Sequence, residues 1–301
     1  MEKILITGGS GLIGKNLSSY LSSQNYEVRL LSRKKDLNNS SVYFWDLESG
    51  YIDEEALAGI DHIIHLAGAG IAEKRWTAKR KNEIIESRVK SAELLFSEVN
   101  KMYIKPKTFI SASAVGYYGA VTTEKVFTET DNPENDFQGK VCQQWESSSQ
   151  KFSELGIRNV QLRFGVVLSA KGGALPRMML PIKLWIGSAL GTGNQFVPWV
   201  HIDDVARIIE KAILDEDISG PYNVVAPEYK TNKELVEAIA WKMGKPLFMP
   251  NVPRFLLKLI LGEMSQLVGS RISSKKILDS AYTFSYPILD KALSDLLSDD
   301  N

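Results

Sequence analysis

The sequence predicts an α/β protein: a Rossmann-like, doubly wound parallel sheet followed by a small, mostly helical C-terminal region. Three observations indicate this fold class. Short apolar runs alternate with helical patterns through the first two thirds of the chain, a glycine cluster follows the first apolar run, and the alternation stops after about residue 168. Strands that are buried on both faces and separated by helices are typical of a parallel sheet with helices on both sides.

The predicted elements alternate in chain order. Strands are expected at 3–9, 26–33, 42–47, 61–70, 107–113, 159–168 and 222–226, and helices at 12–25, 77–101, 138–155 and 203–215. Apolar residues recur near helical spacing along 77–101, so this is expected to be a long helix.

The composition changes after this alternating part. Residues 169–199 are rich in glycine and proline with apolar residues between them, which is typical of a substrate-facing loop region rather than of a sheet. We therefore divide the chain into a Rossmann core at 1–168, a substrate-loop region with the last strand and helix of the core at 169–227, and a C-terminal cap at 228–301.

Charge and composition argue against several classes of partner. Lysine plus arginine and aspartate plus glutamate both number 36 in the 301 residues, so no strong overall field favours nucleic acid or an anionic membrane. The apolar stretch at 254–264 is too short and too interrupted to cross a bilayer, and we expect a buried or partner-facing helix there. We therefore expect a small-molecule substrate, with no nucleic acid and no membrane as partner.

Cysteine and histidine are scarce. With Cys142 as its one cysteine, the chain can form no intramolecular disulfide, which fits the reducing cytoplasm where we expect the protein. His62 and His65 lie three apart on a predicted strand and so should face opposite sides, and His201 is distant in sequence. The sequence therefore predicts no metal site.

A glycine-rich loop follows the first predicted strand directly and opens the first helix. It comprises Gly8, Gly9, Ser10, Gly11, Leu12, Ile13 and Gly14. One glycine permits a turn with positive φ, another lets the backbone approach a phosphate closely, and a third lets the helix pack on the strand. The helix N-terminus then offers N–H groups to a pyrophosphate. This spacing predicts a dinucleotide site, with a glycine-rich turn that holds no ligand as the alternative.

The second strand indicates which dinucleotide binds. NAD sites usually carry an acidic residue at the end of this strand, which bonds the ribose 2′-hydroxyl. Here the strand ends in the basic run 32–35, "SRKK", in which Arg33 could pair with a 2′-phosphate as a planar fork. The sequence therefore favours NADP(H), with NAD(H) as the alternative. Asp46 and Leu47, after the third strand, are expected near the adenine, unless they are only a polar strand end.

Several motifs together carry a resemblance to a known family. "TGGSGLIG", "HLAGAG" and "SASAVGYYG" stand in the order of the extended short-chain dehydrogenase/reductase superfamily. "HLAGAGIAEKRWTAKRKNEIIESR", "LRFGVVLSAKGGALPRM" and "WVHIDD" are more similar still to an atypical branch, the epimerase-family proteins. Members of that branch are labelled nucleoside-diphosphate-sugar epimerases or, in some cases, cell-division inhibitors. The resemblance covers nearly the whole chain, including the C-terminal cap.

The resemblance implies a catalytic apparatus that this chain carries only in part. In the superfamily a serine after the fifth strand helps to bind the reacting oxygen, and Ser113 matches it, with Ser111 on the same strand face as a second candidate. A Tyr-x-x-x-Lys pair on the next helix handles the proton. When Glu146 sets the register, the matching positions are Gln138 and Cys142. Neither can do this work, because an amide does not titrate and a thiol cannot replace an ammonium group.

An enzyme would therefore need a replacement acid. Tyr117 and Tyr118 follow Ser113 and are the candidates for it, although buried phenols more often serve packing. Ala67 and Gly68 are expected beside the nicotinamide half of the cofactor, because small residues let it lie close to the backbone.

Six further residues are candidates for binding the substrate. Arginines could bind a diphosphate bidentately, and tryptophans could stack on a flat ring. The candidates are Arg75, Trp76, Arg88, Arg163, Trp199 and His201. For each, a structural role is the alternative: a solvated helix end, a packed ring or a helix entry.

Two functions remain open from the sequence. The first is an NADP-dependent oxidoreductase or epimerase acting on a polar, nucleotide-linked substrate, which the cofactor loop, Ser113 and the region 169–199 favour. The second is a non-catalytic NADPH-binding protein that senses redox state or regulates a partner, which the missing tyrosine and lysine favour. The resemblance also suggests a homodimer.

Overall fold

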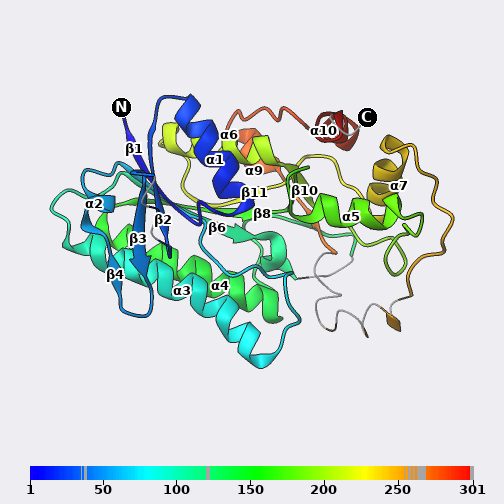
Figure 1. The fold of residues 1–301 in the computed structure, drawn as a ribbon, viewed down its shortest axis with the longest axis horizontal. Helices are drawn as coiled ribbons and strands as arrows, with labels where there is room; N and C mark the ends of the chain where they lie inside the picture. The colour runs from blue at the N-terminus through cyan, green and yellow to red at the C-terminus, as the bar shows by residue number, and fades with distance from the viewer. Residues whose placement is uncertain are drawn as a thin grey trace.

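A computed structural model gives the arrangement of these elements (Figure 1). The structure describes residues 1–34, 36, 39–119, 123–253, 255–256, 259, 262 and 269–298. Most of the stretch 254–264, where we expected a helix, lies outside the described residues. In the part of the chain that is described, no helix is long and apolar enough to cross a membrane.

An eight-stranded sheet forms the centre of the molecule, with its strands in the order β11-β8-β6-β5-β1-β2-β3-β4. They are β1 (Lys3–Thr7), β2 (Glu27–Ser32), β3 (Val42–Asp46), β4 (Tyr51–Ile52), β5 (His62–His65), β6 (Thr108–Ala114), β8 (Arg158–Phe164) and β11 (Gly220–Val224). Neighbouring strands are parallel, except that β4 runs antiparallel to β3 at the edge. The predicted parallel sheet is confirmed.

Helices cover both faces of this sheet (Figure 1). On one face lie α1 (Leu12–Ser23) and α6 (Ile202–Leu214), and on the other α2 (Glu54–Leu57), α3 (Ala78–Lys101) and α4 (Phe137–Gln150). Side chains alternate along β1: Ile4 and Ile6 join the apolar cluster under α1 and α6, whereas Leu5 joins the cluster under α3. Both faces of the strands are therefore buried, which explains the continuous apolar runs in the sequence.

Shorter elements complete the fold around the sheet. They are β7 (Val126–Phe127), β9 (Val166–Leu168), β10 (Trp199–His201), β12 (Arg271–Ile272), η1 (Val115–Tyr118), η2 (Lys151–Leu155), α5 (Ala174–Lys183), α7 (Asn232–Lys242), α9 (Lys275–Asp279) and α10 (Leu289–Leu296). β12 pairs with β7 and so fastens the C-terminal part of the chain to the core.

One predicted strand is divided in two. The run 159–168 forms β8 and β9, which separate at Gly165 and join different sheets. A Cβ on Gly165 would lie 2.6 Å from the backbone oxygen of Pro198, so the two chain segments cross there too closely for a side chain. The apolar run alone could not show this break, because apolar residues continue on both sides of Gly165.

The direction of winding reverses between β1 and β5. From β1, strands β2 and β3 follow on one side, while β5, β6 and β8 follow on the other. Ligands of such sheets bind outside the carboxyl ends of the strands, at this switch point. The loops after β1, β5 and β6 are therefore the first place to look for a functional site.

A buried hydrogen-bond chain fixes the loop after β5. The Thr7 hydroxyl accepts hydrogen bonds from the backbone N–H groups of Leu66 and Ala67. It therefore donates its own hydrogen to His65 Nδ1, 2.8 Å away. His65 Nε2 then carries the ring hydrogen and donates it to Ser91 Oγ of α3, at 3.2 Å. His65 has no exposed surface, and burial lowers its pKa to about 4, so this chain requires a neutral imidazole.

We expect His65 to make the fold sensitive to acid. Its pKa is about 6.5 in an unfolded chain but about 4 in the folded protein, so between these values the proton favours unfolding. The free energy of unfolding has its full value above the pKa that His65 has in the unfolded chain. It decreases as the pH falls toward the pKa of His65 in the folded protein, by about 2 kcal/mol at pH 5. Urea unfolding at pH 7.5 and 5.0, for wild type and His65→Asn, measures this loss.

The variant should lose less stability between the two pH values than the wild type does. It will keep some pH dependence, because burial also lowers the pKa of His62 and His201. An identical pH dependence in the two proteins would show that His65 is not responsible.

Candidate functional site

The loop after β1 has the backbone of a phosphate-binding turn. Gly8 has a φ of +72°, and a Cβ there would lie 2.8 Å from the backbone of Leu66 in the loop after β5. A Cβ on Gly14 would lie 2.4 Å from Gly8 O, so α1 packs on the strand only because position 14 has no side chain. The first and third glycines thus bring helix, strand and neighbouring loop into contact.

Gly11 differs, because the space beside it is tight but not blocked. Its φ of −74° suits any residue, and an added Cβ would come no closer than 3.2 Å to Gly8 O. It precedes α1, whose first turn has no acidic residue and whose N-cap makes no side-chain hydrogen bond. In contrast, Thr77 and Asp136 cap α3 and α4. The N-terminus of α1 is therefore open to an anion.

The other residues of this loop differ in burial and in the segments that they contact. Ser10 is exposed, Gly9 is buried against β2, and Ile13 packs on the central apolar cluster. Leu12 lies against the glycine pair 172–173, where a Cβ on the second glycine would come within 2.9 Å of its side chain. The glycine-rich region that follows β9 therefore reaches the phosphate loop.

Basic side chains follow the end of β2. Arg33 and Lys34 are both exposed, and Lys35 lies outside the described residues. Because β2 is the neighbour of β1 in the sheet, the Arg33 guanidinium would lie on the adenosine side of a dinucleotide bound with its pyrophosphate at α1. An exposed arginine at this place can reach a 2′-phosphate.

Asp46 and Leu47 mark the end of β3, one strand further out. Asp46 accepts hydrogen bonds from Ser49 Oγ at 2.7 Å and from the Glu48 backbone N–H at 3.1 Å, and these bonds lower its pKa. Leu47 packs on the apolar cluster beneath α3. Asp46 thus closes its own turn, and its carboxylate already has partners.

Small residues bring the loop after β5 to the same edge. Ala67 is half-buried, and its backbone N–H donates a hydrogen bond to Thr7 Oγ1 at 3.1 Å. Gly68 is exposed. A Cβ on Gly68 would lie 3.0 Å from Arg88 Cζ, so glycine leaves room for this guanidinium. Arg88 Nη1 donates to Ala69 O at 3.0 Å. The backbone of the loop, with the Arg88 side chain beneath it, therefore borders the switch point.

A polar network joins three neighbouring strands at their carboxyl ends. Ser113 of β6, Arg163 of β8 and Asn223 of β11 are partners in the sheet register. Glu146 of α4 accepts hydrogen bonds from Ser113 Oγ at 2.6 Å and from Arg163 Nε and Nη2, both at 2.8 Å. Ser113 and Arg163 each keep 2 % of their surface exposed. Arg163 is thus committed to Glu146 and is not presented to a substrate diphosphate.

Both tyrosines after β6 pack on Arg163. Its Nη1 donates to Tyr118 Oη at 2.7 Å, and this hydroxyl donates to Asn223 Oδ1 at 2.7 Å. Tyr118 has no exposed surface, and burial raises its pKa well above its usual value. The ring of Tyr117 lies 3.5 Å from the guanidinium carbon, and burial raises its pKa as well. Neither phenol is acidified, so this geometry favours the structural alternative for both.

The face of α4 toward β6 is closed. Gln138 is buried, and its Oε1 would lie 3.0 Å from a Cβ on Gly116. Cys142 Sγ donates to Ala114 O at 3.5 Å, and burial raises the pKa of the thiol to about 12. At the two positions where the resemblance expects a tyrosine and a lysine, neither residue can exchange a proton near pH 7.

Two predicted site residues lie inside the core. Ser111 has no exposed surface, and its hydroxyl donates to the backbone oxygen of Ala112. Trp199 in β10 is also fully buried, in a cluster with Leu168 and Leu235. A ring without exposed surface cannot stack on a ligand, so the fold does not bring Trp199 to the site.

His201 joins α6 to the C-terminal helix. Its Nδ1 accepts from the Asp203 backbone N–H, its ring stacks on Tyr286 at 3.7 Å, and its Nε2 lies 3.2 Å from an Asp295 oxygen of α10. One potential ligand atom each of His201, Asp203 and Asp295 lies within 4.8 Å of the others, as a metal site would require. Nδ1 has a backbone partner and Nε2 faces the Asp295 carboxylate, so the group joins α6 to α10.

Arg75 and Trp76 lie just before α3. Arg75 is exposed and donates to Leu259 O at 3.3 Å. Trp76 is half-buried: its Nε1 donates to Ile71 O at 2.8 Å, and its ring packs edge-on against Phe137 of α4 at 4.8 Å. Of this pair, Arg75 is the side chain that remains accessible near the loop after β5.

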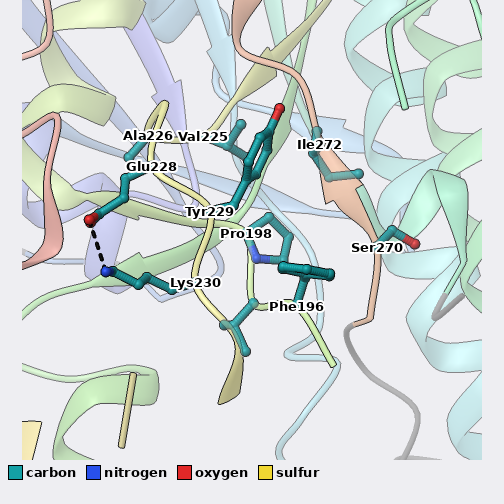
Figure 2. A pocket seen from close by; sticks show the side chains of 10 residues that line it. Phe196, Pro198, Val225, Ala226, Glu228, Tyr229, Lys230, Ser270 and Ile272 are labelled. Atoms are coloured by element: carbon teal, nitrogen blue, oxygen red, sulfur yellow. Dashed lines mark ion pairs between the residues drawn. The ribbon is translucent and has the colours of Figure 1, made fainter. Parts of the chain in front are cut away.

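A small pocket lies next to the tyrosines (Figure 2). It is lined by 196–198, 225–226, 228–230, Ser270 and Ile272. Figure 2 shows Glu228 and Lys230 paired on one side, at 2.9 Å, and the Ser270 side chain on the other. Val225 and Ile272 also pack on Tyr118, so the pocket shares a wall with the polar network. Its lining is largely apolar, and its free space is close to that of one water molecule.

Comparison with known proteins places these features in a family. The model of the NAD dependent epimerase/dehydratase family matches residues 4–225, and a second model, described as a domain of unknown function, matches residues 252–296. The chain therefore belongs to the NAD dependent epimerase/dehydratase family. The resemblance to epimerase-family proteins that the motifs indicated is confirmed.

Similar proteins extend over the whole chain. The epimerase family protein YfhF of Bacillus subtilis (strain 168) is 40 % identical over 302 residues, which cover 98 % of each chain. The crystal structure of the human epimerase family protein SDR39U1 (isoform 2), solved with NADPH, is 29 % identical, with a TM-score of 0.87 and 99 % of each chain covered. The nucleoside-diphosphate sugar epimerase of Corynebacterium glutamicum is 31 % identical, with a TM-score of 0.81; 98 % of this chain aligns with 58 % of that one.

Sequence analysis missed the partners of Ser113 and Arg163. Glu146 served only to set the register, and neither Asn223 nor Glu129, which accepts from the Asn223 backbone N–H at 2.8 Å, was singled out. The available signal was a polar side chain at the same depth in adjacent apolar strands, which indicates a buried network because buried polar groups need partners.

Alanine substitutions in the phosphate loop should separate stability from binding. A methyl group at position 14 would lie 2.4 Å from Gly8 O, so we expect Gly14→Ala to destabilise the fold by about 1–3 kcal/mol. At position 11 the methyl group would lie 3.2 Å from Gly8 O, a tight contact that a small backbone shift relieves, so Gly11→Ala should cost much less stability than Gly14→Ala. It should lower dinucleotide affinity about tenfold, because it occupies the space that a phosphate would take.

Thermal unfolding and fluorescence titration with NADPH measure the two effects. If Gly11→Ala unfolded as early as Gly14→Ala, or bound NADPH as well as the wild type does, the separate roles of the two glycines would be wrong.

Proposed function

We propose that this protein binds NADP(H) across the carboxyl ends of β2, β1 and β5 and transfers hydride to or from a polar substrate, as an oxidoreductase or epimerase. One observation carries the proposal: the phosphate loop leaves the N-terminus of α1 uncapped at Gly11, with an exposed Arg33 one strand away. An anion-binding helix end beside a separate cation suits a pyrophosphate and a 2′-phosphate of the same molecule.

The comparisons support the choice of cofactor. The human relative was solved with NADPH and aligns over 99 % of both chains. In this chain, exposed Arg33 and Lys34 follow β2, where an NAD site would usually carry an acidic residue. The cofactor would accept or supply hydride, while Ala67 and Gly68 would let its nicotinamide half lie close to the backbone.

Ser113 and Glu146 are the residues that we propose to handle the proton. When a substrate alcohol is oxidised, its carbon gives up hydride and its hydroxyl gives up a proton. Ser113 Oγ could take this proton while passing its own to Glu146, 2.6 Å away, and the reverse transfer would serve reduction. Since Ser113 is nearly buried, this role requires the substrate oxygen to reach it from the carboxyl end of β6.

For the substrate we propose a polar, nucleotide-linked molecule, with a sugar as the reacting part. The named relative from Corynebacterium glutamicum is a nucleoside-diphosphate sugar epimerase. In this chain, exposed Arg75 offers a cation for a phosphate, and Phe196 and Tyr229 present aromatic side chains at the small pocket of Figure 2.

One observation favours a second function, a non-catalytic NADPH-binding protein. Gln138 and Cys142 close the face of α4, and Tyr118 is held between Arg163 and Asn223. A regulator needs the cofactor loop but no acid beside it. The two functions differ in what Ser113 does, which can be measured.

Arg33→Ala should weaken NADPH binding about tenfold and leave NADH binding nearly unchanged. A hydrogen bond to a charged group contributes about 1.5–3 kcal/mol, and only NADPH carries the 2′-phosphate that Arg33 would meet. Titration of the wild type and of Arg33→Ala with NADPH and with NADH measures the two affinities. Lys101→Ala, which replaces an exposed lysine at the far end of α3, is the control. Equal losses for NADPH and NADH would contradict the assignment of Arg33.

Ser113→Ala should abolish most turnover and leave the NADPH dissociation constant unchanged, because it removes the proton path but no cofactor contact. It should also cost about 1 kcal/mol of stability through the lost hydrogen bond to Glu146. Ser111→Ala is the matched control, since that buried hydroxyl contacts only the neighbouring backbone.

The assay follows NADPH fluorescence while protein and NADP⁺ are mixed with a metabolite extract. A signal that Ser113→Ala lacks and Ser111→Ala keeps would support the enzyme. Turnover that persists in Ser113→Ala would remove Ser113 from the mechanism. NADPH binding without any signal would favour the regulator over an oxidoreductase.

A further inference from the structure

Arg88 differs from the other buried arginines of the described chain. Four arginines keep 9 % or less of their surface exposed: Arg29, Arg80, Arg88 and Arg163. Three of them pair with carboxylates: Arg29 with Glu27, Arg80 with Glu73 and Glu83, and Arg163 with Glu146. Arg88, exposed to 8 %, pairs with no carboxylate among the residues that the structure describes. A buried charge normally requires such a partner.

The contacts that Arg88 does make leave part of its guanidinium unsatisfied. Nη1 donates to Ala69 O at 3.0 Å and to Ile84 O at 2.8 Å, both neutral acceptors. Nε is buried without any hydrogen-bond partner. The guanidinium carbon lies 4.6 Å above the ring of Trp145, which supports the charge only weakly. Burial lowers the pKa of Arg88 to about 10, as expected of a cation without a counter-charge.

The position of this charge relates it to the cofactor. Gly68 is exposed, and a Cβ on it would lie 3.0 Å from Arg88 Cζ, so only a glycine backbone separates the guanidinium from the carboxyl edge of β5. In the proposed mode, a dinucleotide crosses this edge from β2, with its 2′-phosphate at Arg33, to β1, with its pyrophosphate at α1. The next strand is β5, and the next unit of the molecule is the ribose of the nicotinamide half.

We propose that Arg88 binds the ribose of the nicotinamide half, supplying from α3 the cation that α4 lacks. The inference rests on the proposed NADP(H) binding and adds to it the residue that holds the second ribose. Cys142 lies one helical turn before Trp145, the α4 residue on which the Arg88 guanidinium packs. A guanidinium presents several N–H donors in one plane, which suits two adjacent hydroxyl groups. Arg88 thus acts as a positioning residue that fixes the nicotinamide ring.

Arg88→Met tests this proposal, because methionine keeps an unbranched stem over Trp145 and removes the charge. A residue that holds only the fold would cost stability when it is replaced. Removing an unpaired buried charge should instead leave the melting temperature of the ligand-free protein unchanged or raise it. NADPH affinity should fall about tenfold, while affinity for adenosine 2′,5′-bisphosphate, which lacks the nicotinamide half, should not change.

A double variant guards against an indirect effect. Arg88→Met combined with Cys142→Lys places an ammonium group on α4 facing the same space, so it should restore much of the lost NADPH affinity. Calorimetric titration with NADPH and with adenosine 2′,5′-bisphosphate, together with thermal unfolding of the ligand-free proteins, gives all the values. Arg88→Lys should lie between the wild type and Arg88→Met.

The outcomes separate this inference from the proposal on which it rests. Equal losses for both ligands, or a lower melting temperature with unchanged NADPH affinity, would overturn the role of Arg88 and leave NADP(H) binding intact. Failure of the wild-type protein to bind either ligand would overturn the cofactor proposal itself, and the role of Arg88 with it.

Discussion

The ion pair between Glu146 and Arg163 holds together the carboxyl end of the sheet. Its side chains keep only 14 % and 3 % of their surface exposed, so each charge depends on the other. The carboxylate also binds Ser113 of β6, and the guanidinium also binds Tyr118 of η1, which in turn binds Asn223 of β11. Losing one charge would leave the other buried and unpaired, at a cost of about 3–5 kcal/mol. The shape of the edge where a ligand would bind therefore depends on this pair.

The same network limits the chemistry that is available there. Tyr118 and Arg163 look from the sequence like a phenol and a cation awaiting a substrate, but each satisfies the other inside the protein. Only Ser113 links the network to a strand end that faces the switch point, and it does so through a carboxylate rather than through a titrating phenol. The paired network at the carboxyl ends of β6, β8 and β11 and the uncapped phosphate loop thus meet opposite demands. Buried polar groups must be paired, whereas a binding site must leave hydrogen-bond donors unpaired.

The sequence could predict those features that are decided by residues close together in the chain. The phosphate loop followed from glycine spacing, because steric contact within a few residues decides that backbone, and the strands themselves followed from apolar runs. Trp199, His201 and Arg163 were all expected at the substrate, yet the first two are buried by segments far away in the chain, and the third by Glu146. A tryptophan or an arginine has the same letter in a core and in a cleft. Only the packing of distant elements distinguishes them.

Arg88 and Arg163 show information that the structure adds to the sequence, namely which buried arginine has a charged partner. Both are buried arginines beside α4. Arg163 has a bidentate carboxylate and a phenol, so its charge is neutralised within the fold. Arg88 has two backbone carbonyls and an aromatic face, so its charge is not. Since burying a cation without a counter-charge is costly, its retention beside an exposed glycine is best explained by a ligand that completes its hydrogen bonds.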